Sequence, residues 1–292
     1  MKNFLFYNSN TGAGAIGEVV GDVFRTIKSF DPGAFAINWS HIEPTPRGVL
    51  FYNQDTGETA VGSLSEGDFR TTDAFPAGFL APGWTHIRDT GEYVLFYRAS
   101  TGEGAIVAGF DSPAGPIQTA KSFPADSFAR GWTHIIQSPA DALLMLFYNA
   151  ATGEGAIAEQ FDNRPPSPEP HFAAPNDIRT LQFFQAGSFA SGWSHIVPIA
   201  GGEILFYDQQ TGAGAVGTLT RAGFTTERTF PAGDFTTGWT HIVWAGDSIL
   251  FYNAANGAGA IGFNPTVRSF PAGSFLVGWT HVVARVDPPP IP

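Results

Sequence analysis

FPAGSFLVGWTH, residues 270–281, is the stretch around which the chain is organised. The sequence contains six copies of it. In each copy the leading Phe stands nine residues before a Trp, and a His follows two residues after the Trp. The copies occupy residues 30–41, 75–86, 123–134, 184–195, 230–241 and 270–281. A unit that recurs every 40 to 61 residues indicates a repeat architecture.

A second phrase alternates with the first. Leu-Phe-Tyr or a close variant, a short polar turn and a Gly-Ala-Ile-Gly-like stretch also occur six times. In the unit around residue 250 we expect a first strand at 239–244, a second at 248–252 and a third at 259–262; the fourth ends at the leading Phe, as in 224–230. Four short strands per unit without helical periodicity are typical of a β-propeller blade. The competing architecture is a parallel β-helix, whose coils are usually shorter and whose ends need caps.

The two ends of the chain predict how the ring closes. The N-terminus begins with a second strand, 4–8, and the C-terminus ends after a first strand, 279–286. We therefore predict an all-β, six-bladed β-propeller of four-stranded antiparallel blades, closed by N-terminal strands plus a C-terminal first strand. Residues 1–292 are expected to form one domain, with a Pro-rich loop at 163–171 and a Pro-rich tail at 287–292.

The amino-acid composition limits the classes of binding partner and of chemistry that are available to the chain. The formal net charge of -11 argues against nucleic acid and against an acidic membrane surface as binding partners. Without Cys, no disulfide or thiolate chemistry is available. The chain enters a repeat within its first eight residues, so we expect no signal peptide, and no apolar run suits a membrane span. The expected location is the cytoplasm, with release by a route without a signal peptide left open.

The repeated Trp and His side chains lie two residues apart, on one face of a strand. One interpretation packs each Trp between blades with its His hydrogen-bonded beside it. The other places each Trp at the rim of a cleft, where it stacks on a ligand. The candidate stacking residues are Trp39, Trp84, Trp132, Trp193, Trp239 and Trp279.

Polar residues at the turn after each Leu-Phe-Tyr phrase are further candidates for binding. Gly and Asn there suit a tight turn, but turn chemistry does not explain why three turns carry a carboxylate. The candidate hydrogen-bonding residues are Asn8, Asn53, Asn149, Asn253, Glu58, Glu103 and Glu154.

Metal sites and catalytic motifs have little support. Six His in separate interblade layers cannot converge on one ion, and loops such as 43–48 lack the run of oxygen ligands that calcium requires. The sequence contains no Gly-x-Ser-x-Gly elbow, no HExxH and no phosphate-binding loop. We therefore expect no metal, no cofactor and no enzymatic activity.

With its six Trp-containing units, the chain resembles the β-propeller lectins, in architecture the six-bladed fucose-binding lectins of fungi and bacteria, and more loosely the tachylectin-like propellers. The resemblance implies a multivalent carbohydrate-binding protein with glycans as partners. Two alternatives stay open. One is a protein-interaction scaffold that uses the Pro-rich loop, and the other is an enzyme with a single site in the central channel, where Tyr93, Arg98 and Trp244 differ from the other units.

Overall fold

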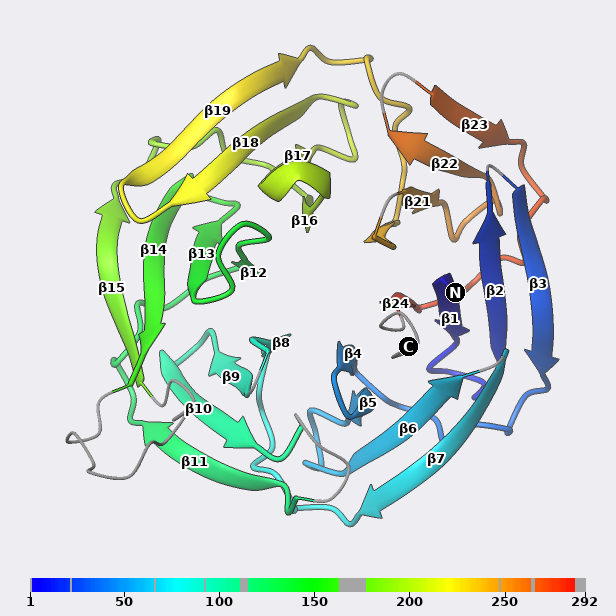
Figure 1. The fold of residues 1–292 in the computed structure, drawn as a ribbon, viewed down its shortest axis with the longest axis horizontal. Coiled ribbons are helices and arrows are strands. Elements are labelled where there is room, and N and C mark those ends of the chain that lie inside the picture. Colours follow the sequence, from blue (N-terminus) through cyan, green and yellow to red (C-terminus); the bar gives the residue numbers. More distant parts are fainter. Residues whose placement is uncertain are drawn as a thin grey trace, which may run out of the picture.

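Six four-stranded antiparallel sheets form a ring in the computed structural model (Figure 1). The structure describes residues 2–21, 23–65, 67–91, 93–110, 115–162, 177–246, 248–263 and 266–286. The predicted six-bladed β-propeller is confirmed, and the parallel β-helix is excluded because neighbouring strands of each sheet run antiparallel.

Each blade runs from an inner strand beside the axis to an outer strand at the rim. Blade 1 contains β24 (His281–Val286), β1 (Lys2–Tyr7), β2 (Gly14–Val20) and β3 (Val23–Phe30). Blade 2 contains β4 (His41–Thr45), β5 (Gly48–Tyr52), β6 (Thr59–Ser65) and β7 (Asp68–Phe75). Blade 3 contains β8 (His86–Asp89), β9 (Val94–Arg98), β10 (Glu103–Ala108) and β11 (Gln118–Phe123).

The other three blades follow the same order. Blade 4 contains β12 (His134–Gln137), β13 (Leu144–Asn149), β14 (Glu154–Phe161) and β15 (Asp177–Phe184). Blade 5 contains β16 (His195–Pro198), β17 (Glu203–Tyr207), β18 (Gly214–Thr220) and β19 (Gly223–Phe230). Blade 6 contains β20 (His241–Trp244), β21 (Ile249–Tyr252), β22 (Gly259–Phe263) and β23 (Thr266–Phe270).

Blade 1 joins the two ends of the chain. Strand β24 pairs with β1 in a register that runs from Lys2 opposite Val286 to Tyr7 opposite His281. This is the predicted closure: three strands from the beginning of the chain and one from its end share a sheet. The closure therefore gives β1 a hydrogen-bonded partner on both sides, β24 and β2, so that the N-terminal strand is not an edge of the sheet.

In blade 2, burial is greatest in the second and third strands and lowest in the outer strand. The second strand of blade 2 is buried at every residue, because both faces of a blade pack against neighbouring blades. The outer strand β7 alternates between exposed and half-buried residues. The Leu-Phe-Tyr phrase thus supplies the core, which explains why it is apolar on both faces rather than alternating.

The inner strands begin at the His, not at the Trp as predicted. Strand β20 starts at His241, and Trp239 ends the connection from the preceding blade. The Trp backbone is not available to the ladder: the backbone N–H groups of Trp84, Trp132 and Trp239 lie 3.3 to 3.4 Å from a Tyr hydroxyl oxygen.

The Pro-rich loop predicted at 163–171 and the tail at 287–292 lie outside the described residues. The scaffold hypothesis that uses this loop therefore stays a prediction. Within the described part of the chain there is one short 3-10 helix, η1 (Ala200–Gly202), and no helix that is long and apolar enough to cross a membrane.

Candidate functional site

The six predicted Trp rings lie in the packing between blades. Each contacts the Phe of its own blade's second strand, with ring centroids 5.9 to 6.1 Å apart. Five of the rings are buried and Trp193 is half-buried. The packing interpretation is confirmed for their position, and their stacking on a ligand stays a prediction. The pairs are Trp279–Phe6, Trp39–Phe51, Trp84–Phe96, Trp132–Phe147, Trp193–Phe206 and Trp239–Phe251.

The six repeated His side chains link the blades in a closed circle. Each ring bonds a backbone carbonyl oxygen of the next blade, and in five of the six the Nε2 distance is 3.0 to 3.2 Å. Because a carbonyl oxygen only accepts, Nε2 carries the proton. The bonds join His281 to Ser40, His41 to Thr85, His86 to Thr133, His134 to Ser194, His195 to Thr240 and His241 to Thr280.

Burial lowers the pKa of all six His, to about 4 for His86 and His134. The six imidazoles are therefore neutral at pH 7. In this state Nδ1 is an acceptor, and it lies 2.9 Å from the hydroxyl oxygen of the preceding Ser or Thr in every blade.

The four predicted Asn hold their turns. The Oδ1 atom of Asn8 accepts the backbone N–H groups of Asn10 and Thr11, and that of Asn53 accepts those of Asp55 and Thr56. Asn149 and Asn253 make the same kind of bond, to Ala151 and to Ala255 and Asn256 respectively. Their acceptor atoms are thus committed to the turn, and ligand binding by them stays a prediction.

The three predicted Glu are in different surroundings. Glu103 forms an ion pair with Arg98, whose guanidinium also lies over the Trp84 ring, 5.0 Å from its centroid. The Glu154 carboxylate accepts the Thr152 hydroxyl at 3.1 Å. Glu58 is exposed, and its carboxylate has no hydrogen-bond or ion-pair partner among the described residues.

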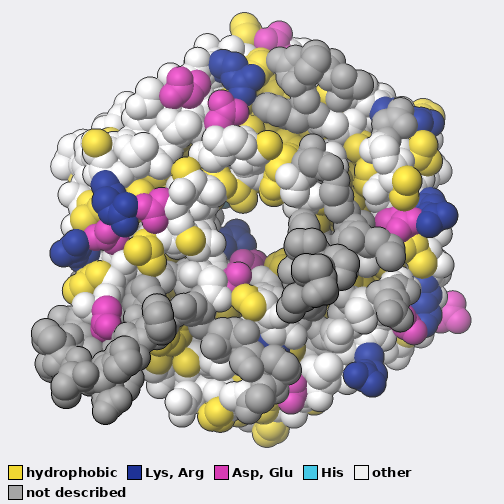
Figure 2. Space-filling model, viewed as in Figure 1, with side chains coloured by type: hydrophobic (Ala, Val, Ile, Leu, Met, Phe, Trp, Pro, Cys, Tyr) yellow, Lys and Arg dark blue, Asp and Glu magenta, His cyan; other side chains and the backbone are white. Residues whose placement is uncertain are grey.

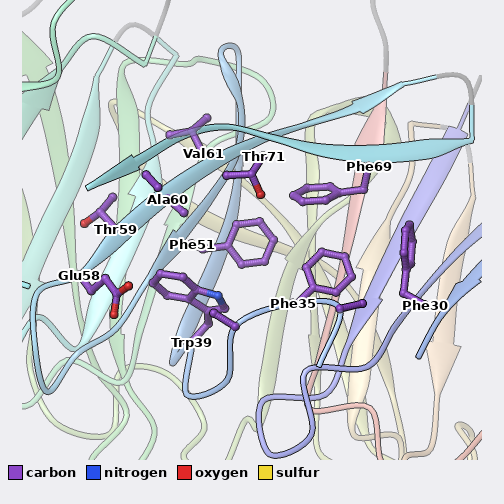
Figure 3. Close-up of a pocket in the computed structure, with 13 residues that line it drawn as sticks. Phe30, Phe35, Trp39, Phe51, Glu58, Thr59, Ala60, Val61, Phe69 and Thr71 are labelled. Atoms are coloured by element: carbon purple, nitrogen blue, oxygen red, sulfur yellow. The ribbon is translucent and has the colours of Figure 1, made fainter. Parts of the chain in front are cut away.

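Two crevices open between neighbouring blades beside predicted Trp residues. The first has a volume of 290 Å³ and lies between the connection that follows β3 and the face of blade 2. Its wall includes Trp39, Phe51 and Glu58 (Figure 3), so the structure brings one predicted Trp and one predicted Glu together. The second has a volume of 260 Å³, lies against blade 1 and is lined by the equivalent residues Trp279 and Phe6.

A larger cavity of 630 Å³ lies on the axis of the ring and is lined by residues of all six inner strands. Figure 2 shows the central opening, with basic and acidic side chains inside it. Most of the lining is apolar, with residues such as Ile42, Ile136, Val197 and Val243. The cavity is therefore a largely apolar channel with one charged sector.

The charged sector consists of Glu43 on β4 and Arg88 and Asp89 on the adjacent β8. Arg88 Nη1 lies 3.0 Å from Glu43 Oε2, and Arg88 Nε donates to the Ile135 carbonyl at 2.7 Å. The second carboxylate oxygen of Glu43 accepts the Asp89 backbone N–H at 3.1 Å. The Glu43 carboxylate thus binds both the Arg88 side chain and the Asp89 backbone of blade 3.

Burial raises the pKa of Asp89 to about 7, and the negative charge of Glu43 contributes to the rise. Burial also raises the pKa of Glu43, although the Arg88 guanidinium opposes this effect. At neutral pH the Asp89 carboxyl is therefore present in both its protonated and its ionised form. Such a group can accept and return a proton under physiological conditions.

Arg88 and Asp89 were not among the predicted site residues, and Glu43 was considered only as part of a loop unsuited to calcium. A comparison of the six copies contains the missing signal. Two residues after the His the chain has Glu43, Arg88, Ile136, Val197, Val243 and Val283; three residues after it, Pro44, Asp89, Gln137, Pro198, Trp244 and Ala284. Charges at these inner-strand positions occur only in blades 2 and 3.

Among the described residues there is no group of three or more His, Cys, Asp or Glu that could hold a metal ion.

No known protein-family model matches the chain, and no curated protein matches it in sequence. Solved structures match it in fold. The Pseudomonas aeruginosa periplasmic gluconolactonase PpgL is 13% identical, with a TM-score of 0.60 over 98% of this chain and 99% of that chain. A Bacteroides uniformis protein proposed to be a 6-phosphogluconolactonase is 15% identical, with a TM-score of 0.55 over 97% of this chain and 85% of that one. A similar proposed enzyme from Bacteroides fragilis is 12% identical, with a TM-score of 0.54 over 92% and 81%.

These neighbours correct the prediction that the chain is not an enzyme. That prediction rested on the absence of familiar catalytic motifs and on the six-fold repetition. Solved structures that share the fold over nearly the whole chain carry the names of lactone hydrolases. Because their sequence identity to this chain is low, the similarity is limited to the fold. The argument from repetition also fails physically, because the inner strands place a single asymmetric charged sector on the axis.

Proposed function

We propose that the axial cavity hydrolyses the cyclic ester of a sugar acid. The observation that carries the proposal is the charged sector of Glu43, Arg88 and Asp89 in an otherwise apolar cavity of 630 Å³. Charges in such surroundings cost free energy, and they cluster where chemistry or binding needs them. A cavity of this size suits a small molecule rather than a polymer. The names of the structural neighbours support the choice of a lactone.

In the proposed reaction, ionised Asp89 takes a proton from a water molecule. The water oxygen bonds to the lactone carbonyl carbon, the ring C–O bond breaks, and Asp89 returns the proton to the leaving oxygen. The product is the open hydroxy acid. Arg88 uses two of its five N–H donors on Glu43 and Ile135, so its guanidinium retains donors for the carbonyl oxygen as negative charge develops there.

The test is hydrolysis of glucono-1,5-lactone, followed by the alkali needed to hold the pH, with the spontaneous rate subtracted. We expect the Asp89→Asn variant, which retains the acceptor oxygen for the Gly91 N–H, to lose about 100-fold or more in rate. The control is Asp55→Asn, which removes an exposed carboxylate outside the cavity and leaves the rate unchanged. Wild-type protein no faster than the spontaneous reaction, or an Asp89→Asn variant as fast as wild type, would overturn the proposal.

Glycan binding at the blades is a second candidate function, as the sequence predicts. Two equivalent crevices beside Trp39 and Trp279 support it, because a multivalent glycan-binding protein needs like sites in more than one blade. Aromatic rings suit the apolar face of a pyranose, and the Glu58 carboxylate suits its hydroxyl groups. Binding to a glycan array at neutral pH tests this function independently of hydrolysis.

A further inference from the structure

Among the residues that the structure describes, three of the six blades share an arrangement that we name the aromatic triad. It consists of a Phe from the preceding connection, the Phe of the second strand and a Phe near the start of the outer strand. The outer Phe lies 4.7 to 5.4 Å from the first and 5.4 to 5.7 Å from the second, between ring centroids. The triads are Phe275, Phe6 and Phe24 in blade 1; Phe35, Phe51 and Phe69 in blade 2; and Phe189, Phe206 and Phe224 in blade 5.

A glycine on the third strand makes room for each outer Phe. A Cβ atom at Gly17, Gly62 or Gly217 would lie 2.0 to 2.4 Å from an atom of that ring. Blades 3 and 4 have Val107 and Ala158 at this position. In place of the outer Phe, blade 3 has Ile117, the residue before β11, and blade 4 has Ile178 in β15. In blade 6 the outer strand β23 begins only at Thr266.

The two crevices coincide with two of these triads. Phe35, Phe51 and Phe69 line the crevice of blade 2, where Figure 3 shows them on the side of the cavity next to Trp39. The other crevice is lined by Phe6, Phe24 and Phe275, beside Trp279. In blade 5, the third blade with a triad, Trp193 is the one repeated Trp that is half-buried rather than buried.

Polar groups complete both walls. The crevice of blade 2 has Glu58 and Thr71, and the crevice of blade 1 has Thr26, Ser29 and Ser274. Among the described residues the indole N–H groups of Trp39 and Trp279 have no hydrogen-bond partner, and neither is sealed from solvent. Aromatic faces with scattered hydroxyl partners suit a ring that has one C–H face and a rim of hydroxyls. Volumes of 290 and 260 Å³ lie at the small end of ligand pockets, which fits one such ring rather than an extended chain.

We infer that the glycan sites number three rather than six, and that they lie at the aromatic triads of blades 1, 2 and 5, each holding one pyranose ring. The crevices of blades 1 and 2 are the two observed examples. This inference rests on the second candidate function above. It replaces the sequence-based expectation of one site at each Trp. Only blade 2 adds a carboxylate, because the position of Glu58 is Ala13 in blade 1 and Ala213 in blade 5. The blade 2 site is therefore the one best supplied with acceptors.

The first test places a bulky side chain at the exposed rim of each aromatic triad. Thr26, Thr71 and Thr226 are exposed and lie opposite the glycines of the three triad blades, and Thr119 is the exposed equivalent in blade 3. The triple variant Thr26→Trp, Thr71→Trp, Thr226→Trp is compared with Thr119→Trp. Calorimetric titrations use methyl α-fucopyranoside, methyl β-galactopyranoside and methyl β-N-acetylglucosaminide. We expect at least one to bind wild type and the Thr119→Trp control equally, and to bind the triple variant at least 10-fold more weakly.

The second test counts sites in wild-type protein labelled with 5-fluorotryptophan. Seven fluorine resonances are expected, one for each Trp. A saturating glycoside should shift three of them, those of Trp39, Trp193 and Trp279, as Trp→Phe variants identify. Trp244 lines the axial cavity, so its resonance reports ligands bound there.

The outcomes separate the two claims. Glycoside binding that survives in the triple variant, or that shifts all six repeated Trp resonances, would overturn the three-site inference and leave glycan binding intact. If no glycoside of the three binds at millimolar concentration, both fail. A shift of the Trp244 resonance alone would place the sugar in the axial cavity and overturn the inference.

Discussion

Asp89 occupies a position of the repeat at which no other blade has a charged residue. Its equivalents in the other blades are Pro44, Gln137, Pro198, Trp244 and Ala284, so no second carboxylate of this position enters the axial cavity. The charge of Arg88 does little to favour ionisation of Asp89, because Arg88 is already paired with Glu43. The Asp89 carboxyl is therefore half-buried and lies beside the negative charge of Glu43, and both effects disfavour its ionised form.

Replacing Glu43 with Gln should lower the pKa of Asp89. The change removes the negative charge that adds to the burial effect, and it leaves Arg88 without its anionic partner, so both consequences favour ionised Asp89. Titration of the Asp89 carboxyl carbon by NMR should give a midpoint near pH 7 in wild type and a lower one in Glu43→Gln. This measurement does not depend on activity. A midpoint that stays in place would mean that Glu43 has no part in the proton affinity of Asp89.

For individual residues, the sequence predicted where the side chains lie in the fold better than it predicted what they do. All six repeated Trp lie in the blade packing, since an indole repeated at one offset in every unit must serve a repeated surface, and crevices lie beside Trp39 and Trp279. The Asn residues occupy the predicted turns, but their acceptor atoms are used there. Arg88 and Asp89 escaped notice because a lone charge on a strand resembles an exposed residue until the ring places that strand on the axis.

Among the elements, the outer strands differ most from blade to blade. Phe69 lies half-buried across Gly62 in blade 2, whereas blade 4 combines Ala158 with Ile178 at the equivalent positions. A β-bulge in the pairing of the third and outer strands falls at these residues in five blades. The sequence could not reveal the triads, because the partners come from three separate segments and a Gly in a strand is normally a sign of weakened packing.

The Gly–Phe pair can be tested by exchanging it for the pair of blade 4. Gly62→Ala alone should destabilise the protein by about 1 to 3 kcal/mol, because the new Cβ displaces the Phe69 ring. The cost of the same change should largely disappear in a Phe69→Ile background. Urea unfolding of the four proteins of this double-mutant cycle gives the coupling energy directly. Equal costs in the two backgrounds would show that the ring and the glycine are not coupled.

For the whole molecule, the number of blades was predictable because it equals the number of copies of the repeat. The closure of the ring was predictable because the sequence begins with a second strand of the repeat and ends with a first strand. A central channel was also expected, but its charged sector was not predictable, because its walls come from residues of six inner strands that lie far apart in the sequence. Together the two proposals describe one division of labour. In that proposed division, the peripheral crevices would bind glycans through several weak contacts, and the axial cavity would hydrolyse a small sugar-derived ester.

The circle of His residues makes the stability of the ring depend on pH. Because their folded pKa values are lowered from 6.5, to about 4 for His86 and His134, the unfolded chain binds more protons between these limits. The stabilisation is complete above about pH 6.5 and is lost as the pH falls toward 4. Asp89 and Glu43 act in the opposite direction, since their pKa values are raised, but they are two groups against six.

We therefore expect the free energy of unfolding to fall steeply from about pH 7.5 to about pH 4.5, by up to about 1.4 kcal/mol per pH unit for each His. Urea unfolding across this range measures the slope. The double variant His86→Gln, His134→Gln keeps an N–H donor for the carbonyl oxygens of Thr133 and Ser194 but cannot titrate, so its slope should be smaller by about two protons. An unchanged slope would mean that His86 and His134 do not contribute to the difference in bound protons between the folded and unfolded chain, because their buried imidazoles must stay neutral in the folded protein for the slope to depend on them.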